Sequence, residues 1–413
     1  RQAAGEGRLQ RGSGCDQAVS ETKRQTLLRD LPEAFDSGPD WLRSLRGRAA
    51  LALRDGGLPT HKTEAWRFTP VRPVVQANLD RARTDTPKLC SSLPDGVTVR
   101  SMKDVLDTDP SLLEGRLDLA GPSEHFAALN TALFEDGLWI DVADGVCVEV
   151  PVEIEHAVGE PGVAYPRVLV TVGRSAELRL IETYAGAASE HLTNGVVEVD
   201  LAPNASVHHV RIHENPGLQV GRVDVRQAAD SRYQSTVITL GGELLRFDVR
   251  CLLQGPGAEC QLDGAYLVDG DDHVDHHTLV EHQAPRCRSD QTYRGIASGK
   301  GTAVFDGIVV VHRDAQKTEA HQENRNLLLS ETATVHTKPH LEIDADDVVC
   351  SHGATVGALD EDQLFYLCAR GIPEDLAHSM LTFAFLEAIV DRIGDEGPRA
   401  RMRAALLARI PRG

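Results

Sequence analysis

Two side chains of the kind that bind soft metals lie two positions apart toward the C-terminal end of the sequence. The stretch from Leu341 to Gly357 reads LEIDADDVVCSHGATVG, and its opening alternation of apolar and acidic residues predicts a half-buried β-strand. If a second strand includes Cys350 and His352, their side chains point to the same face. A thiolate beside an imidazole suits zinc or an iron–sulfur species. The alternative is a buried thiol next to a hydrogen-bonded histidine, with no metal.

A second group of metal-binding residue types occurs in the sequence DGDDHVDHH. On a strand, His273, Asp275 and His277 share one face, and three such ligands could hold zinc or iron. The same residues could instead form a polar row on the outside of a β-structure, so both interpretations stay open. Further histidines follow in later predicted strands: His312, His321, His336 and His340. The sequence does not say which of these meet.

The sequence lacks the patterns of two common enzyme classes. It contains no G-x-x-x-x-G-K-[ST] phosphate loop, so we expect no ATP hydrolysis by the chain alone. It contains no G-x-S-x-G nucleophile motif either. Aromatic residues make up only 4% of the chain, which is few for a sugar-binding groove, although carboxylates for glycoside hydrolysis abound. A carbohydrate-active enzyme and a metalloenzyme built on His273–His282 are the enzymatic alternatives.

Charge and cysteine usage narrow the class of protein. The net charge is −19, and residues 111–360 alone carry −21. This excess of acid argues against binding to nucleic acids or anionic membranes, which need a basic surface. No signal peptide or membrane-spanning stretch is recognisable. The eight cysteines are scattered and form no C-x-x-C pair, so we expect a reducing, cytoplasmic environment.

Changes between helix-like and strand-like patterns along the sequence predict four regions. Residues 1–17 are expected to be a flexible leader, and residues 18–115 a mainly helical region whose first part ends at the Gly56-Gly57-Leu58-Pro59 break. Residues 74–115 should hold loops and short helices. Short β-rich runs separated by turn residues then fill a core at 116–359. The pattern returns to helix at 360–413.

An internal repeat marked by a recurring alanine indicates how the core is organised. Ala176, Ala205, Ala258 and Ala333 each follow an apolar run and a polar turn, at gaps of 29, 53 and 75 residues. These gaps are near multiples of a unit in the mid-twenties, which favours a parallel β-helix over a β-sandwich. The last β-like stretch, Leu341–Gly357, then lies at the terminal turn of the solenoid. A second solenoid could extend the edge of that turn.

The helices after the core have recognisable ends. Asp360 and Gln363 resemble a capping box at the start of one helix, and Gly371 suits its end. Pro373 can begin the next helix. The arginines of the last helix could contact an acidic partner or simply form a solvated face.

Several stretches of the sequence carry a family resemblance. They are KPHLEIDADDVVCSHGATVGALDEDQLFYLCARGI, HVDHHTLVEHQAPRCRSDQTYRGI, ENRNLLLSETATVHTKP and HKTEAWRFTP. All resemble the SufBD family, the scaffold subunits of iron–sulfur cluster assembly, in blocks from Leu58 to Ile393. Within that family, Val-Cys-Ser-His-Gly around Cys350 resembles the SufD type, because SufB-type members place their functional cysteine in a Gln-Cys-Asp-type context. A SufB-like paralogue stays an alternative.

The resemblance implies a fold, partners and a cargo. The fold is a right-handed parallel β-helix flanked by N- and C-terminal helices, and the chain is a scaffold without enzymatic activity. It would pair with a SufB-like subunit and bind a SufC-like ATPase, with a homodimer possible when SufB is absent. An iron–sulfur cluster would form transiently at the junction, and none would stay tightly bound to the isolated chain.

The resemblance also assigns residues. The histidine of the family's C-S-H-G motif lies at the junction and matches His352, which would bind iron or the cluster or accept a proton. Cys350 would be its neighbour or a further ligand. The SufC contact matches the block around Tyr366–Ile393 and includes Tyr366, Arg370, Gly371, Ile372 and Pro373. The stretch with His273 and His277 is also part of the family pattern, which explains these residues without a metal; a metal there is indicated by the residue types alone.

Overall fold

The computed structural model describes residues 27–28, 31, 38–77, 79, 86–118, 124–158, 161–186 and 190–410. The leader predicted at 1–17 lies outside the described residues, as does the start of the predicted N-terminal helix. The division into four regions stays a prediction. No helix in the described part of the chain is both long and apolar enough to cross a membrane.

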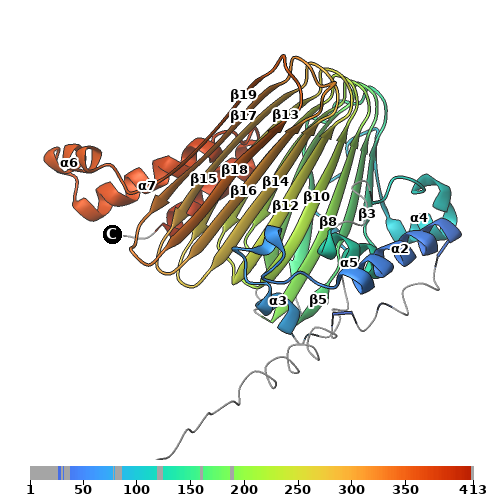
Figure 1. The fold of residues 1–413 in the computed structure, drawn as a ribbon, viewed down its shortest axis with the longest axis horizontal. Coiled ribbons are helices and arrows are strands. Elements are labelled where there is room, and N and C mark those ends of the chain that lie inside the picture. The colour runs from blue at the N-terminus through green and yellow to red at the C-terminus, as the bar shows by residue number, and fades with distance from the viewer. Residues whose placement is uncertain are drawn as a thin grey trace, which may run out of the picture.

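The core is a parallel β-solenoid in which each turn supplies one strand to each of two facing sheets (Figure 1). The predicted fold class, a mainly β solenoid flanked by helices, is confirmed. Sheet A contains, in spatial order, β18 (Thr334–Ile343), β16 (Thr302–Val311), β14 (His273–His282), β12 (Leu244–Leu253), β10 (Leu218–Gln227), β8 (His191–Leu201), β6 (Arg167–Val172), β3 (Leu138–Val142) and β2 (Val97–Ser101), and β5 (Gly162–Ala164) pairs with β8. Sheet B contains β1 (Lys88–Leu89), β4 (Val152–Val158), β7 (Glu177–Gly186), β9 (Ser206–His213), β11 (Arg232–Leu240), β13 (Glu259–Val268), β15 (Arg288–Ala297), β17 (Glu319–Leu328) and β19 (Val349–Gly357).

The structural repeat is longer and less regular than the spacing of the recurring alanines predicts. Successive turns are offset by 26 residues, where Leu218 lies beside Leu244, to 32 residues, where Thr302 lies beside Thr334. Ala176, Ala205 and Ala258 each directly precede a sheet B strand, as equivalent positions of one repeat should. Ala333 instead precedes β18 in sheet A, so the 75-residue gap is not a multiple of the repeat.

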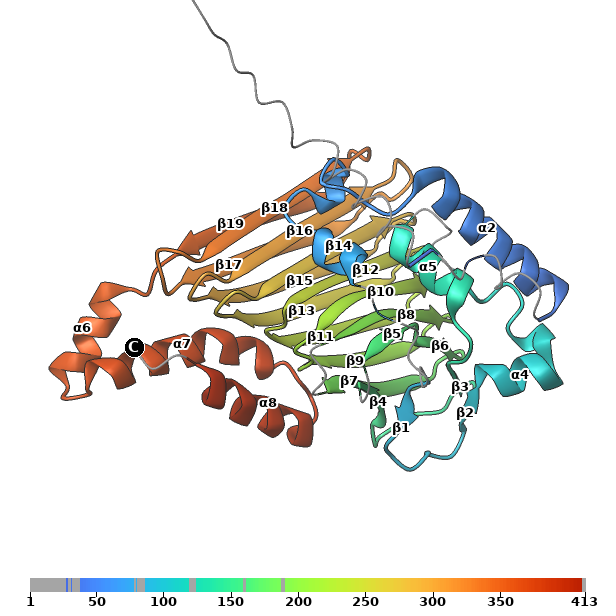
Figure 2. The same ribbon diagram turned by 90° about the horizontal axis from the view of Figure 1, so that it is seen from below.

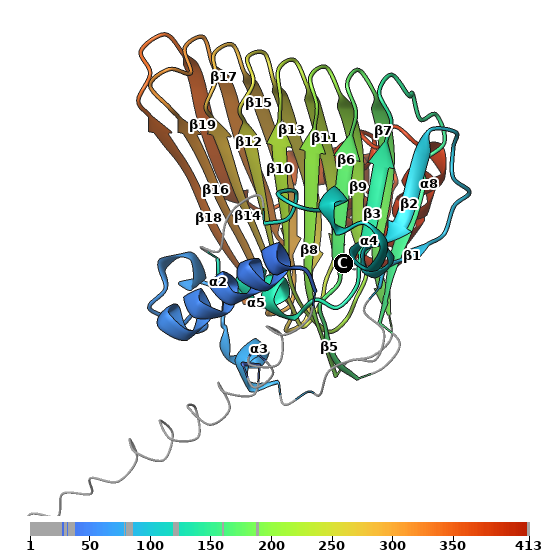
Figure 3. The same ribbon diagram turned by 90° about the vertical axis from the view of Figure 1, so that its right-hand side faces the viewer.

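One turn position explains why small residues recur there. The residues directly before the six sheet B strands β7, β9, β11, β13, β15 and β17 are small and buried: Ala176, Ala205, Ser231, Ala258, Cys287 and Thr318. The residue before each of them is in the left-handed region, with φ between 53° and 74°: Ser175, Asn204, Asp230, Gly257, Arg286 and Lys317. The N–H of each of these donates to a carbonyl of the next turn, at 2.6–3.1 Å. These bonds join successive turns along the edge where the turns line up (Figure 3).

The N-terminal segment covers the outer face of sheet A. Its helices are α2 (Asp40–Gly56), η2 (Glu64–Trp66), α3 (Arg72–Gln76), α4 (Met102–Thr108), η3 (Pro110–Leu112) and α5 (His125–Leu133). They bury one apolar cluster with outward-facing residues of the sheet, among them Leu192 and Leu218. Strands β1 and β2 lie where loops and short helices were predicted, because each pairs antiparallel with a strand far along the chain and has little pattern of its own.

The C-terminal helices α6 (Glu361–Ala369), α7 (Glu374–Val390) and α8 (Glu396–Arg409) lie on the side of sheet B (Figure 2). The second half of α7 packs on the outer face of β11, β13 and β15 through Leu386, Ile389 and Val390. In α8, Arg401 pairs with Glu214 and Arg409 bonds the carbonyl of Leu240, so these arginines attach the helix to the solenoid. Helix α6 extends past the sheets.

The small-residue position gives a test of the solenoid. We expect Ala258→Leu to lower the free energy of unfolding by about 1–3 kcal/mol, because Ala258 is fully buried between turns. Ala333→Leu is the matched control, since Ala333 is 9% exposed next to the terminal strand β18 and should cost less. Denaturant midpoints measure both. Equal losses would contradict the packing described here.

Candidate functional site

Cys350 and His352 lie on β19, the last strand of sheet B. Cys350 pairs with Ala320 and His352 with Gln322 on β17, and both of these partners are buried in the solenoid. The side chains of Cys350 and His352 therefore share the inward face, as their spacing predicts. In the described part of the chain no strand follows β19, so Cys350 is only half-buried and His352 is exposed. Burial raises the pKa of the Cys350 thiol.

The end of the solenoid at β18 and β19 is open (Figures 1 and 3). Among the described strands each of these has a neighbour in its sheet on one edge only, so the backbone groups of the other edge face away from the sheet. Apolar side chains are exposed there, with Val349 at 62%, Val356 at 43% and Ile343 at 41%. Unpaired backbone beside exposed apolar side chains is a surface suited to another chain.

His273, Asp275 and His277 share the outer face of sheet A on β14, but they hold a segment of the protein. Thr69 bonds the ring of His273 at 3.0 Å and donates to Asp275. His277 pairs with Asp275 at 2.9 Å. We call residues 64–69, together with the sheet A side chains that hold them, the N-terminal clasp. The polar row predicted for this face is present, and the N-terminal segment covers it.

Arg246 completes the N-terminal clasp. Its guanidinium lies 4.2 Å from the ring centroid of Trp66, bonds the carbonyl of Ala65 and pairs with Asp275 at 3.1 Å. Burial alone would raise the pKa of Asp275, but the charges of His277 and Arg246 hold that pKa below its usual range. Within the described residues, no three His, Cys, Asp or Glu side chains are grouped so as to hold a metal ion.

The four later histidines do not come together. His312 faces Glu281 at 3.5 Å, and His340 faces Glu342 at 3.3 Å. His321 bonds Ser351 at 2.8 Å. The ring of His336 stacks on Phe68 at 4.2 Å and so belongs to the N-terminal clasp. Each therefore has a partner of its own.

A buried polar cluster that the sequence did not reveal lies inside the solenoid, several turns from β19. Glu182 is fully buried and hydrogen-bonded to His156 at 2.6 Å and to His209 at 3.0 Å. The hydroxyl of Tyr184 donates to it at 2.8 Å. Burial alone would raise the pKa of Glu182, but the bonds to the two histidines lower it well below the usual value. The cluster satisfies its own charges, which suits a structural role.

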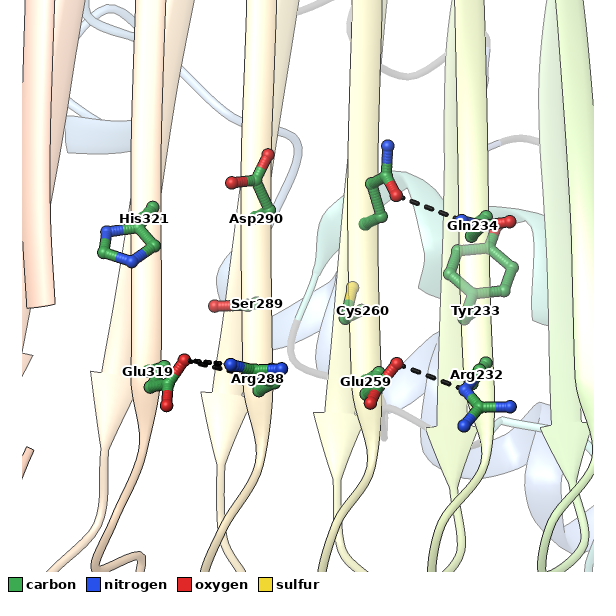
Figure 4. Close-up of a pocket in the computed structure, with 11 residues that line it drawn as sticks. Arg232, Tyr233, Gln234, Glu259, Cys260, Arg288, Ser289, Asp290, Glu319 and His321 are labelled. Atoms are coloured by element: carbon green, nitrogen blue, oxygen red, sulfur yellow. Dashed lines mark hydrogen bonds and ion pairs between the residues drawn. The ribbon is translucent and has the colours of Figure 1, made fainter. Parts of the chain in front are cut away.

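A groove lies on the outer face of sheet B (Figure 4), and the sequence did not predict it either. Residues one turn apart bond along it: Arg232 to Glu259 at 3.2 Å, Arg288 to Glu319 at 2.9 Å, and Gln234 to Gln261 at 3.0 Å. These pairs become visible only when the register of the turns is known. Because the charges neutralise each other, the groove carries little net charge along these rows.

The helices after β19 present an apolar surface. Asp360 caps α6 by accepting from the N–H groups of Asp362 and Gln363, as predicted. Gly371, at φ 86°, ends α6: its N–H bonds the carbonyl of Cys368, and the N–H of Ile372 bonds that of Leu367, which is a Schellman motif. Pro373 is the residue directly before α7.

Large side chains on α6 and on the first half of α7 are exposed: Phe365 at 74%, Tyr366 at 56%, Leu376 at 50% and Met380 at 44%. The guanidinium of Arg370 lies 4.6 Å from the Tyr366 ring centroid. This part of the chain therefore shows an unpacked apolar face, while the second half of α7 is anchored. An exposed apolar patch of this kind marks an interaction surface.

Comparison with known proteins agrees with the geometry. Residues 155–385 match the family model described as SUF system FeS cluster assembly, SufBD core domain, and residues 80–154 match SufBD protein N-terminal region. The chain is 31% identical to the iron-sulfur cluster assembly protein SufD of Escherichia coli, over 86% of this chain and 90% of that protein. It is 34% identical to protein ABCI7, chloroplastic, of Arabidopsis thaliana, over 91% and 88% of the two chains. SufD of Bacillus subtilis is 27% identical over 70% and 67%.

The N-terminal clasp gives a second test. We expect Arg246→Met to lower the free energy of unfolding by about 3–5 kcal/mol, because it removes the buried guanidinium that pairs with the buried Asp275 carboxylate. Arg232→Met removes a guanidinium from an exposed pair and should cost at most about 1 kcal/mol. Thermal and denaturant unfolding compare the two variants. Similar losses would show that the N-terminal clasp does not depend on this charge pair.

Proposed function

The chain belongs to the SufBD family of iron–sulfur cluster assembly proteins, and we propose that it acts in this family as the SufD-type scaffold subunit. It would carry no catalytic activity of its own. The single observation that carries the proposal is the inward-facing pair Cys350 and His352 on the open terminal strand β19. The Cys-Ser-His-Gly sequence at this strand supports the SufD type over the SufB type.

The first proposed partner is a SufB-like solenoid that joins at the open end. Pairing there would satisfy the free edges of β18 and β19 and would bury Val349, Val356 and Ile343. The partner would also enclose His352, which is exposed in this chain alone. A homodimer through the same edges is the form we expect when SufB is absent.

At that junction, iron and sulfide are the substrates from which the cluster is built. His352 would offer one ring nitrogen to iron or accept a proton during sulfur transfer. Cys350, in the next inward position on the same strand, would support it as a neighbour or a second ligand. Further ligands would come from the partner subunit, so that the site is shared between the two chains.

The second proposed partner is a SufC-like ATPase on α6 and the first half of α7. The support is the exposed apolar side chains of Phe365, Tyr366, Leu376 and Met380 on helices that extend past the sheets (Figure 2). Arg370, Gly371, Ile372 and Pro373 form the connection between the two helices. ATP-driven movement of the docked subunits would then reach the junction through this connection.

The junction is tested by His352→Ala. We expect the complex with SufB and SufC to lose its iron and sulfide, because a missing ligand has no substitute there. Stability should change by within about 0.5 kcal/mol, since the side chain is exposed. His340→Ala is the matched control, because His340 lies in the same terminal turn on the outer face of β18.

Iron and sulfide per anaerobically purified complex are the readout, with circular dichroism melting alongside. Normal cluster content in the His352→Ala complex would remove the central role of this histidine. Loss of the complex, or a large drop in melting temperature, would make His352 structural instead.

The ATPase surface is tested by Tyr366→Asp. We expect binding of SufC to weaken at least tenfold while SufB binding stays unchanged, because a carboxylate would have to be buried in an apolar contact. Leu407→Asp is the control, since Leu407 is 61% exposed on α8, the helix after α7. Affinities of purified proteins measure both. Equal effects of the two substitutions, or none, would contradict the assignment.

A further inference from the structure

Gln322 is the inward-facing residue one turn below His352. The register of β17 and β19 places the two side by side in the same column of the solenoid, followed by Gln291 one turn further in. Gln322 is only 3% exposed. Neither its amide oxygen nor its amide nitrogen has a hydrogen-bond partner among the described residues. A buried amide without partners is uncommon in native proteins and calls for a physical reason.

The opposite sheet is built to admit this amide. A Cβ atom added at Gly307 on β16 would lie 2.0 Å from the Gln322 Nε2 atom. The side chain of Gln322 therefore crosses the interior from sheet B and ends against the backbone of sheet A. Any larger residue at position 307 would displace it. The space for a polar side chain at this point is thus part of the fold.

Hydrogen bonds between side chains one turn apart are a recurrent feature of this solenoid. Gln234 donates to Gln261 at 3.0 Å, and Gln254 donates to Gln283 at 3.2 Å. At the terminal turn itself, His321 bonds Ser351 at 2.8 Å. Neighbouring strands are about 4.8 Å apart, so polar side chains in one column reach each other after a rotamer change. His352 and Gln322 have this relation.

We propose that Gln322 is the positioning residue for His352. On docking of the partner solenoid, its amide oxygen accepts the N–H of one ring nitrogen of His352. This fixes the tautomer, so the other ring nitrogen keeps its lone pair and faces the junction. The proposal rests on the function proposed above, and it adds the residue that orients the ligand.

Docking of the partner solenoid explains why the hydrogen bond between His352 and Gln322 forms in the complex. In the free chain His352 is exposed, and water can satisfy its ring. A partner turn stacked on β19 would exclude that water, and the nearest inward amide on the same sheet is that of Gln322. A metal-binding histidine commonly donates its second N–H to such an acceptor, which orients the ring and makes the other nitrogen a better ligand.

Gln322→Met tests the proposal, because it keeps the shape of the side chain and removes the acceptor. We expect the initial rate of cluster assembly in the SufB and SufC complex to fall at least tenfold, the usual effect of losing such an orienting group. The melting temperature of the isolated chain should not fall, since no residue in the described part of the chain hydrogen-bonds this amide. Gln322→Glu keeps an acceptor and should retain assembly.

Gln291→Met is the matched control. Gln291 is equally buried in the same column, but its amide oxygen already accepts from Thr278 at 2.7 Å, and it lies one turn further from the junction. Gln291→Met should slightly lower the free energy of unfolding of the chain and leave the initial rate of cluster assembly unchanged. Equal assembly defects for Gln291→Met and Gln322→Met, or none for Gln322→Met, would overturn the proposal.

A measurement on the unaltered complex does not depend on the folding of any Gln322 variant. Nitrogen chemical shifts of ¹⁵N-histidine report which ring nitrogen carries the proton, and the signal of His352 is identified by its loss in His352→Ala. We expect one tautomer in the metal-free complex and a mixture in the free chain. A mixture in the complex would overturn the inference. If His352→Ala assembles clusters normally, the proposed function fails as well; if only Gln322→Met does, the inference alone fails.

Discussion

In a parallel solenoid, the backbone of each turn is hydrogen-bonded to the turn before it and to the turn after it. This pairing sets the register, and the register decides which side chains of successive turns lie side by side. In the described chain the pairing stops at β18 and β19, so the last turn has one satisfied edge and one free edge. The exposure of His352 follows from that interruption, because the same column is buried in every earlier turn described.

The column that contains His352 changes character along the solenoid. From β7 onward it reads Leu180, His209, Ser235, Leu262, Gln291, Gln322 and His352. Its last three residues, Gln291, Gln322 and His352, are polar, although inward-facing positions are usually apolar. Among the described residues the Gln322 amide has no hydrogen-bond partner, and burying it beneath the open end costs stability there. The opposing Gly307 leaves space for the Gln322 amide, because a Cβ atom at position 307 would lie 2.0 Å from its Nε2 atom.

The architecture was predicted from the local signal of the strands together with the family resemblance. Apolar runs with polar turns identified the core, and period-two spacing placed Cys350 and His352 on one face. What the sequence did not predict depends on contacts between distant parts of the chain. The hydrogen bond between Thr69 and His273 joins residues 204 positions apart, and no local sequence pattern around either residue predicts it. The pairing of Gln322 with His352 likewise needs the register. The apolar pattern of α7 is continuous, so it did not reveal that Ile389 is buried while Leu376 is exposed.

The division of α7 into a free half and an anchored half has a mechanical consequence. A helix of 17 residues is about 25 Å long and behaves as a single rod. Its far half is fastened to the solenoid by Leu386, Ile389 and the bond from Arg294 to the carbonyl of Phe385. Any displacement of the free tip must therefore either tilt the whole rod against β13 and β15 or break that fastening. The helix therefore has the geometry of a lever: a force applied at its free end would act on β13 and β15 through the contacts of its second half.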